Sequence, residues 1–134
     1  MIEVGGFPAN VIFGEDTVTA AKLLMNGKKI AYIADAQVYY SHSYSWNQDF
    51  KRYFDIGVLH ERAGSERNFG STGGEGLRFV KSEISYLWSG NKRYIPSAFI
   101  RTILKFAGYK FGRTRKDFNT TLKCRLSMYK GFWK

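Results

Sequence analysis

Only two short segments of this sequence have the composition of β-strands, and both lie in the front third of the chain. They read "KIAYIADA" (residues 29–36) and "QVYY" (37–40), and both are rich in β-branched and aromatic residues. Two strands alone are marginally stable at best in water. The front of the chain therefore either packs on helices alone or completes a sheet begun upstream, and we favour the second arrangement.

The remaining periodic segments are typical of helices. They span residues 17–26, 45–62, 77–88 and 96–111. Asp16 is the expected N-cap of the first and Gly27 its stop, while Ser45 and Gln48 form a capping box at the start of the second. The expected fold class is α/β of the GT-A type, but incomplete: mostly helical, with one or two strands and about four helices.

The charge of the chain is distributed unevenly. Residues 1–77 hold seven Lys/Arg and nine Asp/Glu, a balance of −2, whereas residues 78–134 hold fourteen Lys/Arg and two Asp/Glu, a balance of +12. Such asymmetry indicates two regions with different roles, the second facing an anionic partner. We expect a front region over 1–68, a glycine-rich loop over 69–76 and a basic helical region over 77–134.

Several classes of protein are disfavoured by the sequence. One cysteine, Cys124, excludes an internal disulfide framework and suits a reducing compartment. The chain shows no signal peptide and no apolar run of about 18 residues that could span a bilayer. The glycine-rich stretch lacks the Gly-Lys-Ser/Thr ending of a P-loop, so it is a linker or a lid.

A wider pattern adds a family resemblance. The segment "VGGFP…FGEDTVTAAKLLMNGKKIAYIADAQVYYSHSYSWNQDFKRYFDIG" resembles the C-terminal part of family 2 glycosyltransferases with the GT-A fold. The similarity continues through "EGLRFVKSEISYL", and "YFDIG" and the terminal "LSMYKGFW" are most similar to bacterial rhamnosyltransferases of surface-polysaccharide synthesis. The family's nucleotide-binding strands and Asp-x-Asp metal motif would lie upstream. The resemblance thus implies a portion of an enzyme that is inactive alone.

The carboxylate pair Glu15–Asp16 has two interpretations. By position alone, Asp16 caps the helix that follows, a contribution of about 1 kcal/mol. By resemblance, Asp16 is the general base that takes a proton from the acceptor hydroxyl, which then attacks the anomeric carbon with inversion. Glu15 would support it, for example by contacting acceptor hydroxyls. The two roles of Asp16 are compatible.

Three further residues have a structural and a functional interpretation. His42 is either a locally bonded loop residue or, by resemblance, a ligand of the Mg²⁺ or Mn²⁺ that the upstream half would mainly hold. Lys51 and Arg52 are either a solvated helix face or, by resemblance, the groups that meet the leaving diphosphate. An Arg fork suits the second role because it can bind phosphate oxygens in pairs.

The basic, aromatic back half could be a packed helical end, a surface for anionic membrane or a nucleic-acid binder. Basic flanks with Phe, Ile and Leu faces match interfacial helices, and no zinc spacing, RNP-like segment or helix-turn-helix supports nucleic acid. The resemblance implies transfer of a sugar, rhamnose from dTDP-rhamnose, to a glycan or lipid-linked acceptor. It would act in the cytoplasm, peripheral to the inner face of the bacterial plasma membrane. The alternative is a non-catalytic basic module that binds membrane or nucleic acid.

Overall fold

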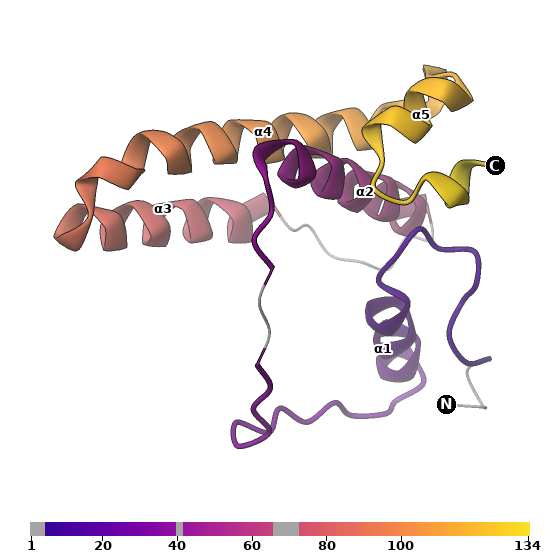
Figure 1. The fold of residues 1–134 in the computed structure, drawn as a ribbon. Helices are drawn as coiled ribbons and strands as arrows, with labels where there is room; N and C mark the ends of the chain where they lie inside the picture. Colours follow the sequence, from indigo (N-terminus) through magenta and orange to yellow (C-terminus); the bar gives the residue numbers. More distant parts are fainter. Residues whose placement is uncertain (1–4, 40–41, 66–72) are drawn as a thin grey trace. The chain divides into compact units, whose positions relative to one another are not determined.

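The computed structural model describes residues 5–39, 42–65 and 73–134. The chain divides into two compact units, residues 1–43 and 44–134, and Figure 1 shows their helices. The elements are α1 (Glu15–Met25), α2 (Trp46–Ser65), α3 (Gly73–Gly90), the 3₁₀ helix η2 (Lys92–Tyr94), α4 (Ile95–Arg113), η3 (Arg115–Asp117), α5 (Thr120–Leu126) and η4 (Lys130–Trp133). None of the described helices is both long enough and apolar enough to cross a membrane.

The predicted α/β fold class is wrong, since the described residues contain helices and no strand. Over 28–39 the backbone is irregular, with a turn in which Ala36 donates to the carbonyl of Ile33 (3.2 Å). The apolar side chains of Tyr32 and Val38 are exposed. A strand requires a neighbour that accepts and donates its backbone hydrogen bonds, and no described residue provides that ladder. Composition alone did not make these segments strands.

The first helix begins earlier than predicted, and its cap is different. α1 starts at Glu15, and its N-cap is Gly14, which adopts the left-handed conformation (φ 75°) and provides no side-chain cap. Asp16 therefore lies inside the first turn, so its prediction as N-cap is wrong. The prediction of Gly27 as the stop is confirmed: it has φ 73°, and Lys28 donates to the carbonyl of Leu23 (3.0 Å).

The second unit is built on the pair α2 and α4. The capping box that opens α2 is confirmed, because the Ser45 backbone N–H donates to Gln48 Oε1 at 2.8 Å. The two helices approach closely at Gly57 and Gly112: a Cβ added at Gly112 would overlap the Phe54 carbonyl oxygen and lie 3.0 Å from Gly57 Cα. Glycines at such a crossing let two backbones meet where any side chain would separate them.

Packing and ion pairs hold α2 against α4 and the tail. Phe54 and Val58 are fully buried, and the Arg101 guanidinium on α4 pairs with the buried Asp49 carboxylate on α2. Farther along α2, Glu61 pairs with the buried Arg115 of η3 at 2.5 Å. A buried charge is tolerated only when it is paired in this way.

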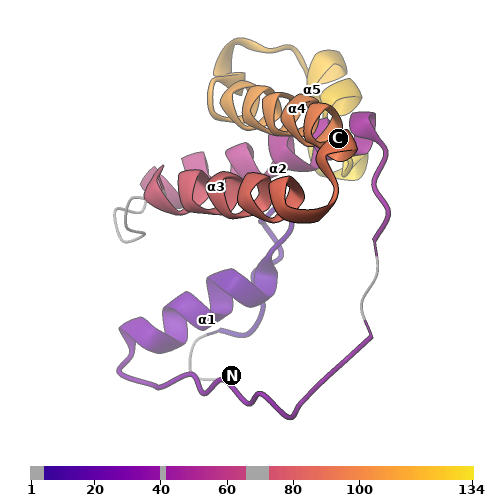
Figure 2. The ribbon, with the colours of Figure 1, turned by 90° about the vertical axis from the view of Figure 1, so that its left-hand side faces the viewer.

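Helix α3 runs beside α4, to which η2 connects it (Figures 1 and 2). It is longer than predicted, because Gly73–Gly76, expected in the glycine-rich loop, form its first turn. Residues 69–72 of that loop lie outside the described residues. The half-buried Val80 and Leu87 lie on one side of α3, while Leu77 and Trp88 are exposed.

Candidate functional site

The two candidate catalytic carboxylates lie together at the start of α1. Gly14 turns the chain immediately before them, and both side chains are exposed in the first helical turn. The positive end of the helix dipole stabilises anionic groups at this position. The sequence therefore places two accessible carboxylates side by side in the first turn of a helix.

A local hydrogen bond orients the side chain of Asp16. Its Oδ1 accepts a hydrogen bond from the backbone N–H of Thr17 at 2.7 Å. Thr19, two residues on, is buried and donates its hydroxyl to the Glu15 carbonyl at 2.7 Å. This anchors the turn from which both carboxylates project. Asp16 is exposed, so an approaching hydroxyl can reach its carboxylate.

The candidate phosphate-binding residues Lys51 and Arg52 lie on α2, in the second unit, and both are half-buried. Arg52 is not extended into solvent. Its Nη1 donates to the Tyr44 hydroxyl at 3.2 Å, and the guanidinium carbon lies 5.4 Å from the centre of that ring. Contact with an aromatic ring restricts the guanidinium to few orientations.

His42 is exposed in the first unit. No group of three His, Cys, Asp or Glu side chains that could hold a metal ion occurs in the part of the chain that the structure describes. His60 of α2 packs on α4: its Nδ1 lies 3.3 Å from the Tyr109 hydroxyl, and the two rings meet edge to face.

The sequence analysis missed a buried acidic residue, Asp55, that joins α2 to the chain end. The Asp55 side chain is completely buried. Its Oδ2 accepts a hydrogen bond from the backbone N–H of Met128 at 2.9 Å, across 73 positions of sequence. The neighbouring Ser127 is also fully buried and accepts from the Tyr129 N–H at 2.9 Å. We call Asp55 and residues 127–129 the tail clamp.

Burial dominates the electrostatics of the tail clamp. It raises the pKa of the Asp55 carboxyl to about 6, although hydrogen bonds from Ser127 and from the Met128 and Tyr129 backbone, and the charge of Arg52, act in the opposite direction. The cause is the loss of water around the carboxylate, which disfavours its charged form. One signal in the sequence could have identified Asp55: a carboxylate between the apolar Phe54 and Ile56, three residues before Val58 of the apolar helix face.

Aromatic and cationic side chains surround the same end of the chain. Trp133 of η4 packs on Phe54, with ring centres 6.4 Å apart, and the cations of Arg115 and Lys123 lie 5.9 and 5.8 Å from its ring. Lys116 adds a second contact to Glu61 at 3.3 Å. The hydrogen bond from Arg115, together with the charge of Arg115 and the contact with Lys116, lowers the pKa of the Glu61 carboxyl, although burial acts in the opposite direction. The tail is thus part of the packed second unit.

The chain is similar along nearly its whole length to curated bacterial rhamnosyltransferases. It is 45% identical over 131 residues, 97% of the chain, to the O-antigen chain rhamnosyltransferase WbaN of Salmonella anatum. It is 44% identical over 132 residues to the O-antigen chain rhamnosyltransferase RfbN of Salmonella typhimurium. The chain spans 42% of the length of each relative. No protein-family model and no solved structure matches it. The resemblance inferred from the motifs is confirmed by these relatives.

Proposed function

We propose that this chain supplies the C-terminal part of an inverting rhamnosyltransferase. The complete enzyme, of the GT-A type, would move rhamnose from a nucleotide sugar, dTDP-rhamnose, to a glycan or lipid-linked acceptor. The observation that carries this proposal is the 45% identity over 97% of the chain to a protein named as an O-antigen chain rhamnosyltransferase. The donor and the GT-A type rest on the motif resemblance.

In this proposal Asp16 is the general base. Its carboxylate takes the proton of the acceptor hydroxyl as the hydroxyl oxygen forms a bond to the anomeric carbon. The bond from that carbon to the nucleotide diphosphate breaks on the opposite face, so the configuration inverts. Exposure in the first turn of α1 and the hydrogen bond from Thr17 support this role, because they leave an oriented, accessible carboxylate. Glu15, beside it, contacts the acceptor hydroxyls.

Arg52 and Lys51 carry the leaving-group side of the proposal. Negative charge develops on the diphosphate as the sugar departs, and fixed cations that stabilise such charge are usually a large catalytic term. The contact with Tyr44 supports this role for Arg52, because it limits the orientations of the guanidinium before substrate binds. Lys51 adds a second positive charge one residue away.

The metal belongs to the complete enzyme in this proposal. Mg²⁺ or Mn²⁺ would be held mainly by the upstream half, with His42 as a late ligand. The described residues of this chain lack a group of three metal-binding side chains, so they do not make such a site by themselves. We therefore assign no step of the reaction to the metal through residues of this chain.

We also place the chain at the anionic inner face of the plasma membrane, as a peripheral protein. The +12 balance of residues 78–134 supports this placement, and so does the lipid linkage of acceptors in related enzymes. The rival function is a basic module without chemistry. It would share the charge, but the relatives that match the chain are named as rhamnosyltransferases, which supports the transferase over this rival.

A chimaera tests the catalytic assignment. The matching region of WbaN is replaced by this chain, and rhamnose transfer from dTDP-rhamnose and donor binding are both measured. Asp16→Asn should lower kcat by about 10²–10⁴ and leave the donor Kd unchanged. Asp117→Asn, which alters an exposed carboxylate of η3, is the matched control and should retain full activity. Equal activity of the two variants would refute the base assignment.

A further inference from the structure

Helix α4 exposes its large apolar side chains on the side opposite its contact with α2. Gly108 and Gly112 are buried in that contact. Phe99, Ile103 and Phe106 follow one another at helical spacing on the opposite side, where they are 61%, 51% and 68% exposed. A helix on the surface of a globular protein normally shows the reverse pattern, with its apolar stripe buried.

The polar side chains of α4 do not account for this reversal, since several of them face the interior. Arg101 pairs with the buried Asp49 of α2. Lys105 is half-buried, with its ammonium 5.6 Å from the centre of the Tyr53 ring. The inner side of α4 is already packed on α2, so the outer apolar side chains are not needed for that contact.

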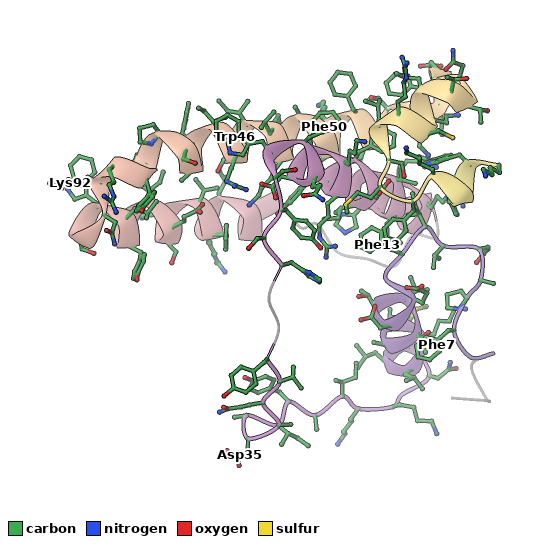
Figure 3. All side chains as sticks on the ribbon, in the orientation of Figure 1. Phe7, Phe13, Asp35, Trp46, Phe50 and Lys92 are labelled. Atoms are coloured by element: carbon green, nitrogen blue, oxygen red, sulfur yellow. The ribbon has the colours of Figure 1, made fainter. Side chains whose placement is uncertain are left out.

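The turn that leads into α4 carries aromatic rings paired with cations. Trp88 at the end of α3 is exposed, and the Lys92 ammonium lies 5.1 Å from its ring centre. The Arg93 guanidinium lies 4.8 Å from the ring of Tyr94, which is also exposed. Figure 3 shows Lys92 at the end of the hairpin formed by α3 and α4. Trp and Tyr accompanied by Lys and Arg are typical of the water–lipid boundary.

The charge of the hairpin favours an anionic lipid surface over a protein partner. Residues 73–113 hold four Lys and four Arg against two Glu, a net charge of +6. Protein–protein interfaces are enriched in Arg and aromatic residues but depleted in Lys. Arg101 and Lys105 face α2, whereas the other six cations are exposed, and half of these six are Lys. Interfacial helices combine apolar and basic residues in this way.

The geometry points to a lipid-docking surface formed by Phe99, Ile103 and Phe106 of α4 with Trp88 and Tyr94 at the adjoining turn. The apolar side chains enter the boundary between head groups and acyl chains, and the cations of the turn bind lipid phosphates. This inference names the residues behind the peripheral location proposed above, and it rests on that proposed function. The surface would hold the enzyme where a lipid-linked acceptor lies.

Vesicle co-sedimentation of the purified chain tests the surface directly. Vesicles of phosphatidylcholine with phosphatidylglycerol should bind the chain, and vesicles of phosphatidylcholine alone should bind it much less. Replacing Phe99, Ile103 and Phe106 together by Ser should weaken binding roughly tenfold or more, because each carries a large apolar area. The control, Tyr32→Ser with Val38→Ser, removes apolar side chains of the first unit that are even more exposed, and it should leave binding unchanged.

A second variant tests the cationic part. Lys92→Glu with Arg93→Glu should weaken binding to anionic vesicles and reduce its dependence on salt. Circular dichroism checks that each variant keeps the helical content of the parent. The proposal would be overturned if the triple variant bound vesicles as well as the parent, or if the parent bound neutral vesicles equally well. It would also be overturned if the chain bound DNA and not vesicles, or if it self-associated through a contact that the triple variant abolishes. The assay does not measure sugar transfer, so an absence of vesicle binding would refute the lipid-docking surface and leave the transferase proposal unaffected.

Discussion

The close crossing of α2 and α4 predicts an unusual cost for a small substitution, Gly112→Ala. The added methyl group would overlap the carbonyl oxygen of Phe54 and lie 3.0 Å from Gly57 Cα. Both neighbours are backbone atoms, so relief requires the helices to separate. Overpacking of this kind costs up to about 3 kcal/mol, and better helix propensity returns about 1 kcal/mol. We expect a net loss of about 2 kcal/mol of unfolding free energy.

Thermal unfolding followed by far-UV circular dichroism measures this loss. A change of about 2 kcal/mol should lower the midpoint by roughly 5–10 °C in a chain of this size. The matched control is Gly76→Ala at the end of the first turn of α3, where the new methyl group meets nothing within 4 Å. Its gain in helix propensity, at most about 1 kcal/mol, should leave the midpoint equal or higher. A Gly112→Ala protein that melts at or above the parent would refute the close crossing.

Two further predictions concern the tail clamp and the activity of the chain alone. The pKa of Asp55 is about 6 in the folded chain against an ordinary 3.8, so the folded state binds more protons between these values. The unfolding free energy should therefore fall by up to about 3 kcal/mol as pH rises from about 4 to above 6. Urea titrations across this range should show that Asp55→Asn lacks that part of the dependence; an identical pH profile would contradict the burial argument. The isolated chain, given dTDP-rhamnose, Mg²⁺ or Mn²⁺ and acceptor, should release no nucleotide, and robust release in a nucleotide assay would show that it needs no upstream half.

The helices could be predicted because their signals are local. Ser45 and Gln48 lie three residues apart, and their reciprocal hydrogen bonds form whatever the rest of the chain does. The strand prediction failed over residues 29–39, the part that the structure describes, because β-propensity reflects a fit to a neighbouring strand more than a preference of the backbone. The helix start near Asp16 was also predicted from local signals, but the N-cap is Gly14, two residues earlier, where the chain turns with a positive φ.

The tail clamp was beyond local signals for a different reason. Asp55 and Met128 are 73 positions apart, and nothing in either segment specifies the other. A carboxylate that becomes buried needs some donor to satisfy it. The sequence does not predict which donor. Only the packing of α2 against the chain end identifies the backbone N–H of Met128.

The tail clamp connects two of the motifs that first suggested a rhamnosyltransferase. "YFDIG" and "LSMYKGFW" resembled that group as separate stretches, and the structure joins them through Asp55 and Met128. Arg52 lies one helical turn before Asp55, and its charge acts on that carboxyl. Arg52 and residues 127–129 therefore act on the same buried carboxylate, and each of them lowers its pKa against the larger effect of burial.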